Sequence, residues 1–310
     1  MAKKDDKNDD VFKKYIAGET GDKNKQAEIV INEIKDNNTM KFLNVDLNTL
    51  PGSIFYKKGT RILIRSASVT EIQAFSVIDE NSPIDILDGI NNLLKSCIKY
   101  FQPNGNLGSY KDVKDCDKIF LIFMIRELTF QANNTLSKTI ECDFCKSEVV
   151  IPYRATPSSI QRTFINYEIN DKLVKYYDSD EAAIALNING TIWHLAPPTI
   201  GLSECFIKDI KDKVQSGDAT NRAFLTIIPY TMIGANSISI DGIKAKLKQF
   251  KSLDGDTFQI LNKTIKLMVF GINKLSMKCT NCEAEVLTDF VFPCKLADFL
   301  VDSSLLEKYY

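Results

Sequence analysis

The sequence predicts an α+β fold with a mostly helical core and β-hairpins, two of which are zinc-knuckle hairpins that meet in one metal site. Three observations support this class. Helical patterns of apolar residues alternate with short strand patterns along the 310 residues. Pro, Gly and Asn-Gly signals separate the strands. Apolar residues make up 44% of the chain, enough for a large core.

The first half begins with a polar segment. Residues 1–38 are rich in Lys, Asp and Asn, and such a segment buries too little apolar surface to offset its ordering entropy. We therefore expect a tail that is flexible or becomes ordered on a partner. Residues 39–157 form the predicted N-terminal α+β module, which contains the first cysteine hairpin.

Local patterns predict the elements of this module. Alternation predicts strands at 41–47 and 61–68, separated by a Pro-Gly turn. Pro83 begins an amphipathic helical run that extends to residue 101, and a Gly-containing loop follows it. Residues 112–133 are apolar on nearly all sides, which indicates a central helix. Residues 138–153 read as strand, cysteine turn and strand.

Residues 158–310 form the predicted C-terminal α+β module. Asn189-Gly190 between two apolar runs is typical of a type I′ hairpin turn. Helical patterns follow near 201–214, 219–233 and 242–269, then a second cysteine hairpin at 275–292 and a short helix at 296–310. An apolar helix leads into a strand, a C-x-x-C and Glu-Val in both halves, which indicates an internal repeat.

Two C-x-x-C pairs provide the candidate site. A C-x-x-C at the turn of a hairpin directs both sulfurs toward one point, and zinc requires four tetrahedral ligands. One such turn supplies two ligands, so two turns complete one site. The gap of 133 residues between the pairs far exceeds that of an ordinary zinc ribbon. We expect one structural Zn²⁺ site that joins the two halves through four ligands: Cys142, Cys145, Cys279 and Cys282.

Three other interpretations of the cysteines remain open at this point. A thioredoxin-like redox pair requires a helix at the C-x-x-C, whereas the residues that follow each pair favour a strand. Two separate metal sites would need further ligands, such as Cys294 or His194. An iron–sulfur cluster also accepts four cysteines.

Composition disfavours several classes of function. The 39 basic and 40 acidic residues give a net charge of −1, which argues against a broad nucleic-acid binder. The longest apolar run has seven residues, so we expect no membrane-spanning helix. There is no glycine-rich phosphate loop, G-x-S-x-G or H-E-x-x-H, and only one His. We expect no catalytic residues and no small-molecule substrate.

Several segments, taken in order, resemble one family. They are LPGSIFYKKGTRILIRSASVTEI, DKIFLIFMIRELTF, IECDFCKSEVVIPY, APPTIG, KCTNCEAEV and FVFP. Over about residues 40–295 the chain resembles the baseplate hub proteins of T-even-type contractile-tailed bacteriophages. The chain differs from the family in its N-terminal extension and in having Lys146 and Glu283 where Gly often follows the second Cys.

The resemblance implies a non-enzymatic structural or assembly component of the tail baseplate hub. Its partners would be other baseplate or tail proteins, and its location the virion and, during assembly, the host cytoplasm. The four knuckle cysteines correspond to the cysteine pairs of the family. The alternative function is a zinc-ribbon accessory factor that acts with nucleic acid, although the sequence around both knuckles is not basic.

Overall fold

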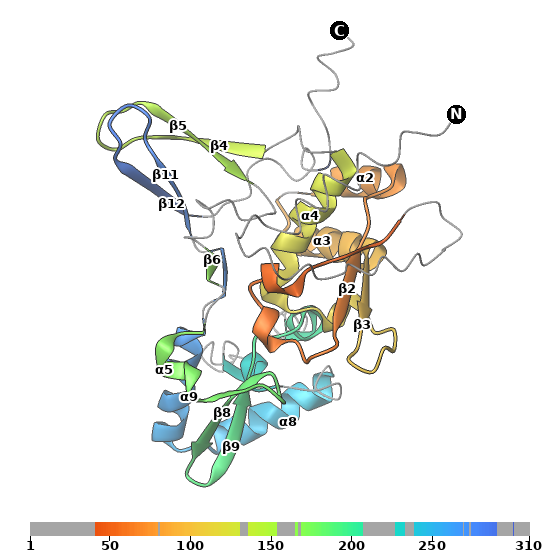
Figure 1. Cartoon of the computed structure of the whole chain (residues 1–310). Helices are drawn as coiled ribbons and strands as arrows, with labels where there is room; N and C mark the ends of the chain where they lie inside the picture. The colour runs from red at the N-terminus through yellow and green to blue at the C-terminus, as the bar shows by residue number, and fades with distance from the viewer. Residues whose placement is uncertain are drawn as a thin grey trace, which may run out of the picture.

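The computed structural model contains helices and small antiparallel sheets, which confirms the α+β class (Figure 1). The predicted tail at 1–38 lies outside the described residues, as does the predicted helix at 296–310 apart from Leu300. The structure describes residues 41–79, 81–130, 136–153, 165–166, 169–206, 227–232, 239–268, 270–272, 274–289 and 300.

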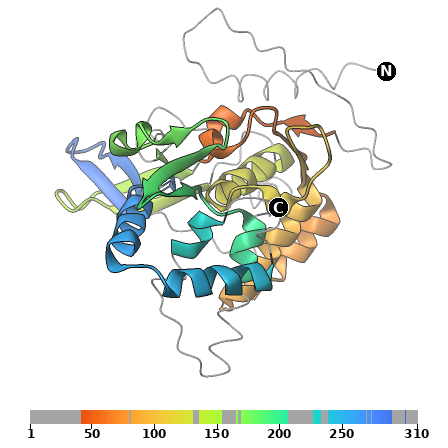
Figure 2. The same ribbon diagram turned by 90° about the horizontal axis from the view of Figure 1, so that it is seen from below.

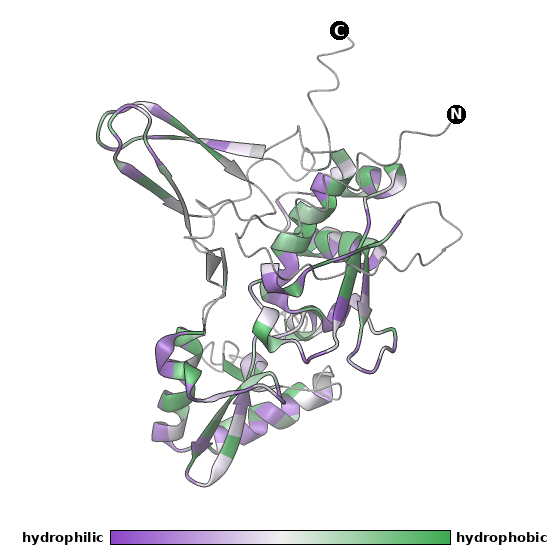
Figure 3. Ribbon diagram, in the orientation of Figure 1, coloured by the Kyte–Doolittle hydropathy of each residue, from purple (hydrophilic) through white to green (hydrophobic). Residues whose placement is uncertain are grey.

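The first group of elements packs on an antiparallel sheet with strand order β1–β2–β3. Within it, residues 120–126 of α4 are all buried, and Figure 3 shows that this helix is largely hydrophobic. The group comprises β1 (Leu43–Asn44), η1 (Leu47–Thr49), η2 (Ser53–Phe55), β2 (Arg61–Ile64), α2 (Val69–Ser76), α3 (Pro83–Cys97), β3 (Ile98–Phe101), η3 (Tyr110–Asp112), η4 (Asp115–Asp117) and α4 (Lys118–Phe130).

Two predicted helices are shorter than expected. The run from Pro83 ends as a helix at Cys97, and residues 98–101 form β3, whose buried residues alternate as it pairs with β2. The apolar helix predicted at 112–133 begins only at Lys118. Residues before it extend toward a distant segment, where the Asp115 amide donates to the Pro198 carbonyl at 2.9 Å. Tertiary hydrogen bonds therefore override the helical pattern there.

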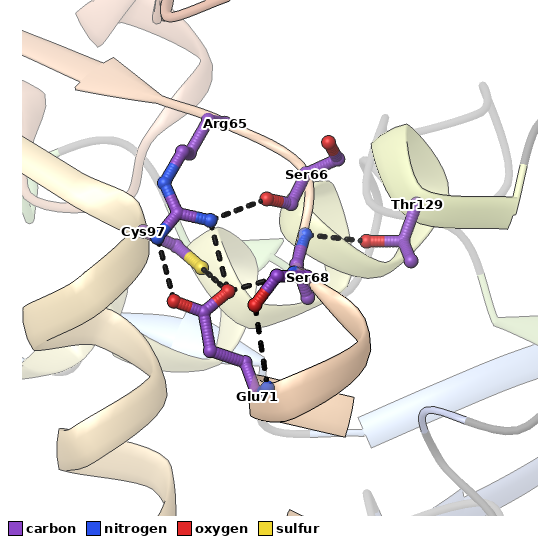
Figure 4. A network of polar contacts seen from close by, with 7 residues as sticks. Arg65, Ser66, Ser68, Glu71, Cys97 and Thr129 are labelled. Carbon is purple, nitrogen blue, oxygen red and sulfur yellow. Dashed lines mark hydrogen bonds and ion pairs between the residues drawn. The ribbon is translucent and has the colours of Figure 1, made fainter. Parts of the chain in front are cut away.

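Helix α2 was not expected from the sequence, although its start carries a capping box. Ser68 accepts a hydrogen bond from the Glu71 amide, and the Glu71 carboxylate accepts one from the Ser68 amide. The same carboxylate pairs with Arg65 at 2.6 Å and lies 3.7 Å from the Cys97 sulfur (Figure 4). Burial raises the pKa of Glu71, but the hydrogen bonds from Arg65 and Ser68 outweigh it and lower the pKa to about 2.

The second group packs around the sheet β7–β8–β9 and forms its own hydrophobic cluster. Figure 2 shows α8 and α9 beside this sheet, and residues 200–206 are also helical. The helix predicted at 242–269 is two helices, because Asp254 caps the second by accepting from the Thr257 amide. Its elements are α5 (Asp171–Val174), β7 (Tyr177–Asp178), β8 (Ala183–Ile188), β9 (Thr191–Leu195), η6 (Ile228–Thr231), α8 (Ile240–Lys251) and α9 (Gly255–Leu267).

The turn between β8 and β9 has the predicted type I′ backbone. Asn189 has φ 52° and Gly190 has φ 81°, and a type I′ turn requires positive φ at both central residues. The described part of the predicted helix at 219–233 is the 3₁₀ helix η6. The described part of the predicted helix at 201–214 is helical through residue 206.

A fully buried carboxyl lies where the two clusters meet. Asp117 accepts from the Gly52 amide at 2.7 Å and from the Tyr56 hydroxyl at 2.6 Å. Phe55 lies between Gly52 and Tyr56 in the sequence. Its ring packs in the second cluster, edge-on to the ring of Tyr177. Burial raises the pKa of Asp117 to about 6, although both hydrogen bonds oppose the shift. Asp117 therefore fixes the loop that inserts Phe55 into the neighbouring cluster.

Two β-hairpins lie side by side at one end of the molecule (Figures 1 and 2). Their buried residues join the first hydrophobic cluster, so residues from both predicted modules share that core. The module boundary at 157/158 stays a prediction. No helix in the described ranges combines the length and apolarity needed to cross a membrane. The hairpins consist of β4 (Leu136–Glu141) with β5 (Glu148–Tyr153), and of β11 (Lys274–Lys278) with β12 (Glu285–Asp289). The short strands β6 (Ile165–Asn166) and β10 (Gly271–Ile272) pair with each other between the hairpins and α5 (Figure 1).

Candidate metal centre

The first C-x-x-C forms the turn between β4 and β5. The Cys142 amide donates to the Ser147 carbonyl at 2.9 Å, and the Lys146 amide donates back to the Cys142 carbonyl at 2.9 Å. Lys146 has φ 61°, in the left-handed region that Gly adopts at no steric cost. The turn thus forms without the Gly that the resemblance would place there, at the cost of backbone strain.

The second C-x-x-C repeats this geometry between β11 and β12. The Cys279 amide donates to the Ala284 carbonyl and the Glu283 amide to the Cys279 carbonyl, both at 2.9 Å. Glu283 has φ 59°, close to the value at the equivalent position of the first turn. The internal repeat indicated by the sequence therefore corresponds to two turns with the same hydrogen bonds.

The four sulfurs of these turns lie within 4.8 Å of one another. Two short distances cross between the hairpins: Cys142 to Cys282 is 3.6 Å, and Cys145 to Cys279 is 3.5 Å. A tetrahedron with Zn–S bonds of about 2.3 Å has sulfur–sulfur edges of about 3.8 Å. A disulfide would need about 2.05 Å. The cluster therefore has the size of a four-sulfur metal site.

The cluster is covered by protein on one side and reaches solvent on the other. Cys142 and Cys279 are 0% and 1% exposed, whereas Cys145 is half-buried and Cys282 is exposed. The first cysteine of each pair belongs to the core, and the second lies toward the surface.

Ser147 is a polar neighbour of the cluster that the sequence did not single out. Its hydroxyl oxygen lies 2.9 Å from the Cys145 sulfur and 3.2 Å from the Cys279 sulfur. It therefore contacts one cysteine from each hairpin. The equivalent position of the second turn is Ala284, which has no hydroxyl. From the sequence, this difference could have been found only by aligning the two turns on their cysteines, which places Ser147 of SEVV opposite Ala284 of AEVL.

Hydrogen bonding gives Cys145, Cys279 and Cys282 unequal thiol pKa values. The Ser147 hydroxyl lowers the pKa of Cys145 to about 6, assisted by the Ser147 amide, and it also lowers the pKa of Cys279. The Ala284 amide lowers the pKa of Cys282, but burial and the neighbouring thiols outweigh it and raise the pKa to about 12. Thiolates are the metal-binding form of cysteine.

The geometry bears on the other interpretations of the cysteines. Strands β5 and β12 follow the two pairs, so neither pair lies at the helix start that a thioredoxin-like site requires. The two pairs lie together rather than in separate sites, and His194 is in β9 and outside the cluster. Cys294 lies outside the described residues.

The four predicted ligands therefore come together and could bind a metal ion. If all four bind, every position of a tetrahedral ion is filled by protein sulfur, and none remains for water or substrate. Comparison with protein-family models, curated proteins and solved structures finds no match to this chain.

Proposed function

We propose that this chain is a non-enzymatic structural protein in which one Zn²⁺ ion joins two hairpins through Cys142, Cys145, Cys279 and Cys282. One observation carries the proposal: four sulfurs from chain segments 133 residues apart lie within 4.8 Å of one another. Tetrahedral sulfur coordination is typical of zinc and of iron–sulfur sites. In a cluster of two or more irons the cysteines would bind different metal atoms, which would hold their sulfurs farther apart. The four sulfurs lie within 4.8 Å of one another, and this spacing favours a single ion.

The proposed role of the ion is mechanical. A two-stranded hairpin is marginally stable by itself. Each hairpin supplies two ligands, and the strands also pack together, with the Lys138 ammonium donating to the Thr288 hydroxyl at 3.1 Å. The ion would fix the relation between β4–β5 and β11–β12, and thereby between the distant segments from which they come.

We further propose that the protein acts in the baseplate hub of a contractile phage tail, as a component of the particle or as an assembly factor. This assignment rests on the resemblance of several segments, taken in order, to that family. The charge at the cysteine turns favours a protein partner over nucleic acid, because acids outnumber lysines there. The exposed charged residues of the two turns are Glu141, Asp143, Lys146, Glu148, Lys278, Glu283 and Glu285.

Two measurements test the two parts of the proposal. Elemental analysis of the purified chain should find one zinc per chain, and iron in its place would overturn the metal assignment. Affinity purification from phage-infected cells, with mass spectrometry of purified virions, should recover tail or baseplate proteins. Recovery of nucleic acid instead, with an affinity that falls steeply as salt rises, would favour the accessory-factor alternative.

A further inference from the structure

We propose that Ser147 is a positioning residue of the metal centre and supplies a hydroxyl donor to its ligand sulfurs. This inference rests on the proposed metal site and adds a residue outside the C-x-x-C pattern. The Ser147 oxygen lies 2.9 Å from the Cys145 sulfur and 3.2 Å from the Cys279 sulfur. It therefore contacts one sulfur from each hairpin, across the junction at which the two cysteine turns meet.

The direction of these hydrogen bonds follows from proton counting. Without metal, either the thiol or the hydroxyl can donate. Metal-bound cysteines are thiolates and carry no proton, so the hydroxyl becomes the only side-chain donor among Ser147, Cys145 and Cys279. One hydroxyl has one proton and can donate it to one thiolate at a time. Rotation about the Cβ–Oγ bond can direct it to Cys145 or to Cys279.

Such a donor would stabilise the bound form in two ways. A zinc ion with four thiolates has a net charge of −2, and a hydrogen bond to sulfur withdraws part of this charge. The hydroxyl also orients Cys145 and Cys279, the sulfurs that approach each other at 3.5 Å across the junction. Removing an outer partner of a metal ligand typically costs about 10–100-fold in metal affinity.

The repeat provides an internal comparison. The two turns share their backbone hydrogen bonds and a left-handed residue after the second Cys. The next position carries a hydroxyl in the first turn, Ser147, and none in the second, Ala284. Both Ser147 and Ala284 close their turn through a backbone carbonyl, so the turn itself does not require a hydroxyl at this position. The asymmetry assigns the hydroxyl to the sulfurs rather than to the formation of the turn.

The test uses the full chain and cobalt(II) as the probe. Ser147→Ala should bind cobalt(II) about 10-fold more weakly than the wild type. Its sulfur-to-metal charge-transfer band should also move to lower energy, because a sulfur without a hydrogen bond is a better electron donor. Ser147→Thr keeps the hydroxyl and should restore both values. Ser137→Ala is the matched control, since Ser137 is an exposed serine of the same hairpin.

The outcomes separate this inference from the proposed metal site. If Ser147→Ala matches the wild type in affinity and spectrum, the inference is wrong and the four-cysteine site stands. If Ser147→Ala loses affinity and Ser147→Thr does not recover it, the hydroxyl is not the cause and the inference is again wrong. If the wild type itself binds neither cobalt(II) nor zinc, the proposed metal site is refuted together with the role of Ser147.

Discussion

Replacing Cys142 and Cys279 together by Ser is the strongest perturbation of the proposed metal centre, because it removes the buried ligand of each hairpin. The two positions are 0% and 1% exposed. In the unfolded chain the cysteine pairs are separated by 133 residues, so only the folded state offers all four sulfurs to one ion. The variant should therefore lose a stabilisation that depends on metal concentration.

The expected loss of stability has two parts. At free zinc about 1,000 times the dissociation constant, binding to the folded state contributes about 4 kcal/mol. Each buried serine hydroxyl left without a partner costs a further 1–3 kcal/mol or so. The total of about 6–10 kcal/mol corresponds to a fall in Tm of roughly 12–40 °C, at about 2–4 °C per kcal/mol.

Thermal unfolding by circular dichroism, with elemental analysis of the same samples, measures this loss. Chelating the metal from the wild type isolates the metal contribution, because the four cysteines remain. Cys205→Ser is the matched control, since Cys205 is a half-buried cysteine outside the cluster. A double variant that kept the wild-type Tm and metal content would refute the idea that the ion joins the hairpins.

Three further predictions concern stability. Lys146→Gly should stabilise the metal-bound protein by up to about 1 kcal/mol in urea unfolding, because φ is 61° at this position and Gly adopts that value without strain. The ion pair of Lys146 with Glu141 is exposed, so its loss should cost little. An unchanged urea midpoint would argue against strain at this turn. Glu71→Gln should cost about 2 kcal/mol at pH 7. The pKa of Glu71 is about 2 in the folded state, against an ordinary value of 4.5. The stabilisation from Glu71 is therefore complete above about pH 4.5 and is lost as the pH falls toward 2. The urea midpoint of Glu71→Gln should depend less on pH between these values than that of the wild type. Asp117 has the opposite sign: its folded pKa of about 6 exceeds the ordinary 3.8, so its contribution is greatest below pH 3.8 and falls by up to about 3 kcal/mol as pH rises through 6. Asp117→Asn should abolish that fall, and a variant with the wild-type pH profile would contradict the assignment.

The sequence predicted best the features that short-range chemistry determines. Asn189-Gly190 specified its turn because few residues tolerate positive φ at both central positions. The cysteine hairpins could be found because each C-x-x-C lies between strand patterns, and the four-ligand requirement of zinc then predicted that the pairs would meet. This inference placed together residues more than 130 positions apart without any long-range signal in the chain.

The errors arose where long-range contacts changed local preference. Residues 98–101 continue a helical pattern, but β2 provides backbone partners for them, and they form a strand. The start of α4 is delayed because the segment before it bonds to residues 198–200. Helix α2 was overlooked although Ser68 and Glu71 carry the capping-box spacing, because the apolar run before it favoured a strand.

The position of the cysteines within the hairpins explains why a metal ion suits this fold. The two turns carry exposed charged residues, including Lys146 and Glu283, because a turn leaves polar backbone and side chains at the surface. Apolar burial therefore stabilises this end of the molecule through the residues behind those exposed positions, such as Val149 and Val286. A bound ion would add stabilisation at the turns themselves, and it would need ligands from both hairpins. Metal retention should therefore depend on both hairpins being folded and in place, which makes it a direct measure of whether these distant parts of the chain have come together.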